Sequence, residues 1–219
     1  MRVWPPDRKL LIGSGIAGGV VLGALLLRRD EKAPLNAPAN VAERELQRWA
    51  GVTEHDPAAL PILKAYWAAT GQAYENPDVP WSAAFVNYVI RSSSTPDALL
   101  PTGAHVFYAR QAYLDRGVPG KYGAYHPTEV SVQPGDIVVR KRSGGDLTFD
   151  DIRMSGPMIP SHGDVVTAVG PTAARAIGGN MGPRYYSTVK SRFITHNGGV
   201  ITDPAVVAVL RYQPPSALS

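Results

Sequence analysis

The pattern of the chain changes near its middle from helical spacing to short runs of β-branched residues. Between residues 41 and 117, apolar residues recur at helical spacing, as in helices that bury one face. From residue 136 onward, short Val- and Ile-rich runs alternate with Pro and Gly turns, as in antiparallel strands. Because helices followed by antiparallel strands pack in layers around one core, the sequence predicts an α+β domain over residues 41–219.

The boundaries of these elements follow from caps, stops and turns. Helices are expected at residues 41–52, 56–71, 81–93 and 104–117, and strands at residues 136–140, 164–170, 174–179, 189–196 and 205–212. Between the first two strands, residues 141–160 are rich in Gly, Pro and Asp. This segment is expected to be a long loop, either a lid over a site or a disordered connection.

Composition and motifs narrow the possible functions. With 44% hydrophobic and 18% charged residues, the 219-residue chain can bury a core. The net charge is only +4, and Lys and Arg form no long block, so no nucleic-acid partner is predicted. The absence of Cys excludes disulfides, thiolate metal sites and a Cys nucleophile. Neither a metal-ligand spacing nor a phosphate-binding glycine motif is present, so no metal or cofactor is predicted.

An uncharged apolar run precedes the domain. Residues 10–27 read LLIGSGIAGGVVLGALLL and are flanked by basic residues on both sides. Because a spanning helix needs about 20 apolar residues, we predict one transmembrane anchor, between a cytoplasmic tail at 1–9 and a linker at 28–40. The domain is then expected to be periplasmic or extracytoplasmic. A cleaved signal peptide is the alternative, although the nearest small-residue cleavage site lies ten residues past this run.

Three glycines are spaced four apart in this apolar run. Gly15, Gly19 and Gly23 lie on one face of the predicted helix, where small residues let helices approach closely. Homo-oligomerisation through this face is therefore possible. The alternative is that Gly is simply common in membrane helices.

Polar residues that could take part in catalysis lie at the ends of predicted elements. Ser82 begins a helix, His162 begins a strand, and Asn180 ends the next strand. A helix packed on a sheet can bring together a hydroxyl that attacks, an imidazole that takes its proton, and a polar group that orients the imidazole. The helix start also favours developing negative charge.

The order of these residues resembles a known superfamily. Ser82-Ala83-Ala84-Phe85-Val86, then Pro134-Gly135-Asp136, then His162 and Asn180, is similar to papain-like cell-wall hydrolases of the NlpC and CHAP type, with Ser82 where those families have Cys. The longer stretch PWSAAFVNYVI is similar to an uncharacterised bacterial family that already has Ser at this position. The resemblance covers roughly residues 41–212.

The resemblance implies a fold and an activity. It implies a papain-like α+β domain, here preceded by one transmembrane helix, in which N-terminal helices pack on an antiparallel sheet. It further implies a peptidoglycan amidase or endopeptidase in which Ser82 attacks, His162 is the base and Asn180 orients His162. Trp81, His105 and Asp164 are expected to contact substrate or support the site.

Each of these residues also has a structural interpretation. Ser82 is a good helix cap, and Asn180 after two glycines is a natural turn residue. His162 suits a hydrogen-bonded strand edge, Trp81 suits the core, and His105 either caps its helix or lies near Ser82. Two alternative functions remain, one motivated by Ser82 in place of Cys and the other by the Gly-rich apolar run. They are a catalytically silent module that binds cell-wall material, or an assembly component of a phage particle or secretion machine.

Overall fold

The computed structural model describes residues 37–142 and 145–215. In this part of the chain, four helices come first: α1 (Pro38–Arg48), α2 (Ala59–Ala69), α3 (Ser82–Arg91) and α4 (His105–Leu114). The strands follow as β1 (Tyr122–Tyr125), β2 (Ile137–Lys141), β3 (Ser161–Val169), β4 (Ala173–Met181), β5 (Thr188–Asn197), β6 (Val200–Ile201) and β7 (Val206–Tyr212). A short helix, α5 (Phe149–Arg153), interrupts the connection between β2 and β3.

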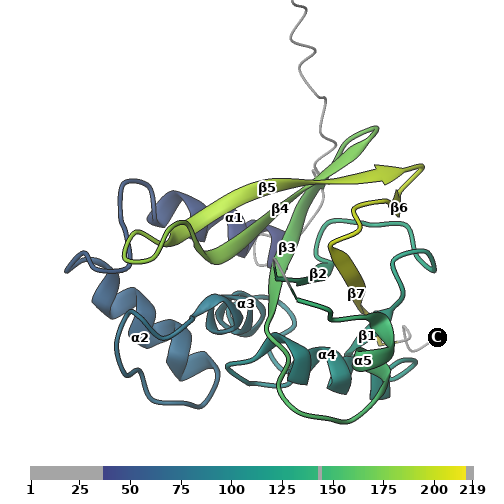
Figure 1. Cartoon of the computed structure of the whole chain (residues 1–219), viewed down its shortest axis with the longest axis horizontal. Coiled ribbons are helices and arrows are strands. Elements are labelled where there is room, and N and C mark those ends of the chain that lie inside the picture. The colour runs from purple at the N-terminus through teal and green to yellow at the C-terminus, as the bar shows by residue number, and fades with distance from the viewer. Residues whose placement is uncertain (1–36, 143–144, 216–219) are drawn as a thin grey trace, which may run out of the picture.

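The described strands form one antiparallel sheet in the order β1-β7-β2-β3-β4-β5-β6. The sheet curls into a half-barrel. Figure 1 shows β4 and β5 crossing the top of the molecule, β3 running down from them through the middle, and β2, β7 and β1 following below and to the right. Register shifts in β2, β3 and β4 accompany this bend, as expected for bulges, which increase local twist.

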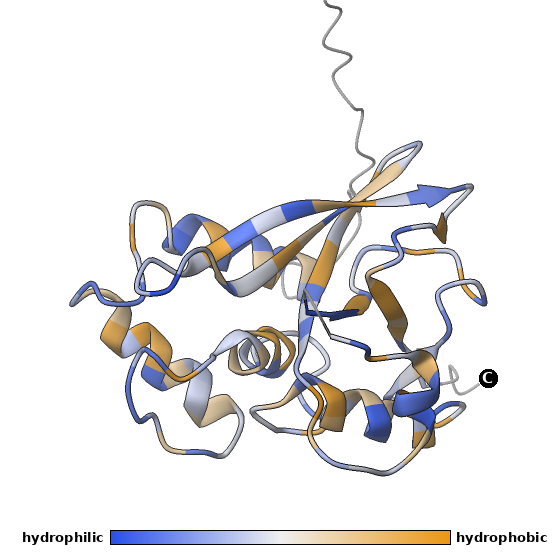
Figure 2. Ribbon diagram, in the orientation of Figure 1, coloured by the Kyte–Doolittle hydropathy of each residue, from blue (hydrophilic) through white to orange (hydrophobic). Residues whose placement is uncertain are grey.

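Each face of the sheet has its own apolar layer. On one face, α1, α3 and α4 pack against β1, β3 and β4. Figure 2 shows apolar colouring on α3 and on β7 and polar colouring along much of the edge region at β5. The second layer fills the opposite face of the curled sheet with Val132, Val138, Val166, Ala174, Ala176, Ile194, Ile201, Val206 and Val209.

Aromatic side chains fix the helices beside α3. The rings of Trp49 and Trp81 stack with centroids 4.8 Å apart, and Tyr66 packs against both. Their polar atoms are paired despite burial: Trp49 Nε1 donates to Tyr66 Oη at 2.8 Å, and Tyr66 Oη donates to Glu45 Oε2 at 2.5 Å. Such pairing removes the cost of burying these donors. The cluster therefore holds the residue that precedes Ser82 in a rigid setting.

The sequence placed most of these elements correctly. The four long helices and the strands β2, β3, β4, β5 and β7 lie within a few residues of their predicted positions. Three elements were not predicted, namely β1, β6 and α5. Residues 141–160 were expected to be a lid or a disordered loop, but in their described part they contain α5, which begins with a capping box between Thr148 and Asp151.

The predicted fold class, a papain-like domain behind one transmembrane helix, requires correction. The structure gives an α+β domain on a curled antiparallel sheet, and the longest helices described, α1 and α2, have 11 residues each. At 1.5 Å per residue such helices are about half as long as the roughly 30 Å of a bilayer core. Within residues 37–142 and 145–215, no helix is long and apolar enough to cross a membrane. The anchor predicted at 10–27 and the glycine face of Gly15, Gly19 and Gly23 lie outside the described residues.

Candidate functional site

Ser82 is the first residue of α3, but it does not cap the helix. Trp81 occupies the cap position, and no side chain makes a capping hydrogen bond there. The Ser82 side chain instead turns toward α4, where its Oγ lies 2.7 Å from His105 Nε2. Both residues are buried, with Ser82 2% and His105 4% exposed. The capping interpretation of Ser82 is therefore wrong, and its hydroxyl is hydrogen-bonded to the imidazole of His105.

His105 connects Ser82 to a tyrosine. It is the first residue of α4, and its Nδ1 lies 2.5 Å from the hydroxyl oxygen of Tyr108, one turn further along the same helix. Two tautomers fit these distances. In one of them Nδ1–H donates to Tyr108 Oη, and Nε2 is then free to accept the proton of the Ser82 hydroxyl. The arrangement has the order hydroxyl, imidazole and orienting group that nucleophilic catalysis requires.

Burial keeps this chain of groups uncharged at neutral pH. Burial, followed by the nearby His162, lowers the pKa of His105 well below 6.5, with Asp164 opposing and Arg142 reinforcing the shift. Burial also raises the pKa of Tyr108 well above 10, and Asp164 adds to this effect. A neutral imidazole can accept a proton, whereas a neutral phenol can act as either donor or acceptor. His105 is thus in the protonation state of a general base.

A second histidine lies beside the first on β3. The rings of His105 and His162 have centroids 5.6 Å apart. His162 Nε2 is 3.0 Å from Asp164 Oδ1, and the other oxygen of Asp164 is 3.4 Å from Arg192 Nε. Burial alone would raise the pKa of Asp164, but His162, Arg192 and Arg140 outweigh it and lower the pKa. Asp164 is therefore an anion that orients His162.

The structure separates the three residues that were predicted to act together. No hydrogen bond joins Ser82 to His162 in the described part of the chain, because Ser82 bonds to His105 and His162 bonds to Asp164. Asn180 is also placed elsewhere. Its Nδ2 donates to Glu54 Oε2 at 3.1 Å, so it does not orient His162. Trp81, expected to contact substrate, is fully buried in the aromatic cluster.

Glu54 is a buried carboxylate that the sequence did not single out. Besides Asn180, it accepts hydrogen bonds from Trp81 Nε1 at 3.0 Å and from the backbone N–H of Ser187 at 3.3 Å. Asn180 reaches it from a left-handed backbone conformation with φ of 57°, which Asn tolerates better than most residues. The carboxylate thus joins the start of α3 to the β4–β5 hairpin.

We expect this backbone conformation to control how substitutions at Asn180 affect stability. Asn180→Ala and Asn180→Gly both remove the hydrogen bond to Glu54, but only alanine places a Cβ in the left-handed region. The free energy of unfolding should therefore be about 1 kcal/mol lower for the alanine variant than for the glycine variant. Urea unfolding of both variants measures this difference. Equal stabilities would contradict it.

Three glycines let the backbone approach these side chains closely. A Cβ on Gly163 would collide with Tyr108 Oη and lie 2.6 Å from His105 Nδ1. A Cβ on Gly178 would collide with Asp164 Oδ1 and lie 2.8 Å from His162 Nε2. On Gly179 it would lie 2.6 Å from Phe85 Cβ. Strands β3 and β4 therefore carry glycine at the positions that contact the His105–Tyr108 pair, the His162–Asp164 pair and α3.

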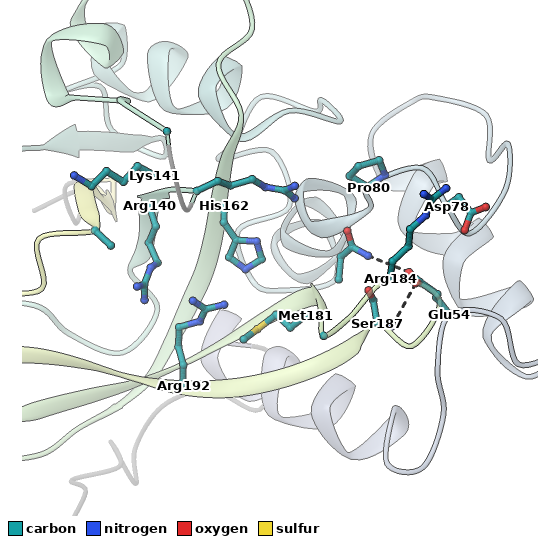
Figure 3. Close-up of a pocket in the computed structure, with 15 residues that line it drawn as sticks. Glu54, Asp78, Pro80, Arg140, Lys141, His162, Met181, Arg184, Ser187 and Arg192 are labelled. Atoms are coloured by element: carbon teal, nitrogen blue, oxygen red, sulfur yellow. Dashed lines mark hydrogen bonds between the residues drawn. The ribbon is translucent and has the colours of Figure 1, made fainter.

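Two cavities meet at the site. The first, here called the Ser82 pocket, has a volume near 450 Å³ and includes Ser82, His105 and apolar side chains: Trp67, Val79, Phe107, Met158, Ile159 and Pro160. The second, here called the basic cleft, has a volume near 1060 Å³ and includes His162 and five Lys or Arg side chains among its described lining (Figure 3). Pro80 and Arg142 border both cavities. The two cavities are therefore neighbours, with Ser82 in the lining of the first and His162 in the lining of the second.

The described residues offer no metal centre, since no group of three or more His, Cys, Asp or Glu side chains is placed to hold an ion.

Only one indication in the sequence suggested that Ser82 would pair with His105, the rule that consecutive helices pack together. Tyr108 has a visible signal, because it lies three residues after His105 on a helix. Glu54 has none, since it lies in a connection between α1 and α2.

Comparison with known proteins gives one match. A family model with the description "Uncharacterized protein conserved in bacteria (DUF2272)" matches residues 39–216, which include every residue of the site described above. Neither the curated proteins nor the solved structures gave a match to this chain.

Proposed function

Because the chain belongs to the DUF2272 family, whose description leaves the activity open, we propose a function from the site itself. We propose a hydrolase of peptide or related amide bonds in which Ser82 is the nucleophile and His105 is the general base. The observation that carries this proposal is the hydrogen-bonded chain from Ser82 Oγ through the His105 ring to Tyr108 Oη, at 2.7 Å and 2.5 Å.

The proposed reaction has two halves. Ser82 Oγ attacks the carbonyl carbon while its proton passes to His105 Nε2, and Tyr108 Oη accepts the hydrogen bond of Nδ1–H. The first backbone N–H groups of α3 have no carbonyl partner one turn earlier, so they are available to the oxyanion. The His105 imidazolium then donates its proton to the leaving amine as the C–N bond breaks. Water, deprotonated by His105, hydrolyses the acyl-enzyme and regenerates the Ser82 hydroxyl.

His162 takes a secondary role in this proposal. Asp164 orients it, and its ring lies beside that of His105 rather than on Ser82. From this position it acts on the electrostatics of His105 and borders the basic cleft. We therefore assign His162 to positioning the substrate and not to taking the Ser82 proton.

Bacterial cell-wall peptides are the proposed substrates. This choice rests on the resemblance of PWSAAFVNYVI, PGDIVVR and HGDVVTAVG to cell-wall hydrolases of the NlpC and CHAP type. It is compatible with a family description that refers to bacteria. The two adjoining cavities also support an extended ligand, since together they flank Ser82 with apolar and cationic surfaces.

The test compares three forms of the full chain on purified peptidoglycan. Wild type, Ser82→Ala and Ser94→Ala are incubated with the polymer, and released fragments are identified by mass spectrometry. Ser94 is an exposed serine beyond the end of α3, so its alanine variant is a matched control. Fragments with wild type and Ser94→Ala but not with Ser82→Ala would support the proposal, and their masses would name the bond. Equal release by Ser82→Ala would refute it.

A second candidate function is a binding module without turnover. The observation in its favour is the burial of the two central groups, since Ser82 is 2% and His105 4% exposed. In that case both cavities would hold cell-wall peptides without cleavage. Absence of fragments from wild type, together with equal retention of wild type and Ser82→Ala on insoluble peptidoglycan, would favour this function over hydrolysis.

The low pKa of His105 predicts the pH dependence of both activity and stability. Since the protonated ring accepts no proton, kcat/KM should fall on the acid side with a midpoint below pH 6.5. In the unfolded chain this histidine binds a proton near pH 6.5, whereas in the folded chain it does so only at lower pH. The free energy of unfolding should therefore decrease as pH falls below about 6.5. A pH–rate profile checks the first statement, and an acid midpoint above pH 7 would contradict it.

A further inference from the structure

The basic cleft combines cations from two strands and two connections. Its lining includes Arg140 and Lys141 from β2, Arg142 just after β2, Arg184 between β4 and β5, and Arg192 from β5. Two carboxylates also line it, Glu54 and Asp78. Figure 3 shows these two acids near Arg184, at the opposite end from Arg140, Lys141 and Arg192. The cleft is thus cationic at the end that contains His162.

Internal ion pairs neutralise only part of the charge at this end. Arg140 pairs with Asp203 at 3.2 Å, and Arg192 lies 3.4 Å from Asp164, which His162 shares. Lys141 and Arg142 are exposed, and neither has an acidic partner among the described residues. Four cationic side chains therefore face two carboxylates, which leaves an excess of two positive charges. An excess of one sign in a concave site raises the local concentration of ligands with the opposite charge.

Arg142 connects this positive charge to the reacting groups. It borders both the basic cleft and the Ser82 pocket, and its charge contributes to the low pKa of His105. A ligand whose carbonyl lies at Ser82 would therefore have a cation beside it on the side of the basic cleft. On the other side, the Ser82 pocket offers apolar walls such as Phe107 and Ile159. The two cavities thus present different chemistry on the two sides of the nucleophile.

We propose that the His162 end of the basic cleft binds a free carboxylate of the substrate, with Lys141 and Arg142 as its main partners. This inference deepens the proposed function and rests on it for the position of the scissile bond. The guanidinium of Arg142 can pair with a carboxylate in a two-pronged geometry, and the exposed Lys141 adds a second positive charge. The substrate class is then a peptide with an apolar side chain on one side of the cleaved bond and a free carboxylate on the other.

The test measures binding directly, with Ser82→Ala as the parent protein so that the peptide probes are not cleaved. Two probes differ only at one end: N-acetyl-leucyl-alanyl-alanine, with a free carboxylate, and the same peptide as its C-terminal carboxamide. Titration calorimetry with the full chain of Ser82→Ala at low salt should give a dissociation constant about two- to fivefold lower for the carboxylate. This preference should shrink as salt is added, because exposed charges are screened over about 10 Å at 0.1 M.

Matched variants locate the effect. In Lys141→Gln/Arg142→Gln the preference should fall to about one, and in Lys64→Gln/Arg91→Gln it should persist, since Lys64 and Arg91 are exposed cations on α2 and α3. Equal affinity of the Ser82→Ala parent for both probes would overturn the inference. So would an equal loss of preference in the two double variants, because it would reflect net charge alone.

The same probes separate this inference from the hydrolase proposal. Carboxylate preference in wild type and Ser82→Ala without cleavage of peptidoglycan would uphold the anion site and refute the hydrolase. Cleavage of peptidoglycan without carboxylate preference would uphold the hydrolase and refute the anion site.

Discussion

Replacing His105 with glutamine is expected to lower kcat/KM for peptide hydrolysis by about 10³-fold, the usual size of a lost general base. The reason is that Gln keeps much of the side-chain volume between Ser82 and Tyr108 but does not take up the Ser82 proton. The hydroxyl then attacks without activation. The steady-state rate at which each protein releases the identified fragments from peptidoglycan measures the loss. Thermal unfolding of the same variant checks that the domain is intact.

The comparison with His162 makes this prediction decisive. His162→Gln should lower kcat/KM by only about 10-fold, because His162 bonds to Asp164 and lies beside the reacting pair. His126→Gln, an exposed histidine after β1, is the control and should retain full activity. A loss in His162→Gln as large as that in His105→Gln would transfer the role of base to His162, as the order of the motifs suggested.

Gly179→Ala is expected to destabilise the domain by about 1–3 kcal/mol, the range for overpacking a well-packed core. The added Cβ would lie 2.6 Å from Phe85 Cβ in α3 and 2.7 Å from the ring of Trp81, the residue at the cap position of α3. Because the backbone of Gly179 does not need a positive φ, the effect is steric and displaces β4 from α3. Chemical unfolding monitored by tryptophan fluorescence measures it.

Gly156→Ala is the matched control for this prediction. Its Cβ would meet only the guanidinium of Arg110, with Nη2 at 3.3 Å rather than 2.6 Å, and its backbone also needs no positive φ. We expect its free energy of unfolding to stay within about 0.5 kcal/mol of wild type. If both alanine variants lose the same stability, the close contact of β4 with α3 is not the cause.

The regular elements could be predicted because their periodicity is local. Apolar spacing located α1 to α4, and β-branched runs located the long strands. Strand β1 was not predicted because its sequence YGAY contains Gly and has no alternating pattern. Its partner strand, β7, is also distant in the sequence. Helix α5 could have been found, since Thr148 and Asp151 have the spacing of a capping box.

The site was harder to predict because it depends on tertiary contacts. The sequence correctly identified Ser82 as the start of a helix and His105 as a residue that could lie beside it. It assigned the base to His162 from motif order, which gives no information on which way a side chain points. Asn180 could not be resolved for the same reason, since its left-handed backbone directs the amide to Glu54.

The hydrogen bonds of Glu54 also determine when the site forms during protein synthesis. This carboxylate binds Trp81, Asn180 and Ser187, and the last two lie 126 and 133 residues further along the chain. The helices that carry Ser82 and His105 thus leave the ribosome long before the hairpin that completes their setting. At about 5–20 residues per second, the nascent chain takes roughly 6–27 seconds to extend from Glu54 to these two residues, with Trp81 as the sole earlier donor of the three to Glu54. The setting of Ser82 is therefore completed late, and a chain that ends before Asn180 lacks two of the three donors to Glu54.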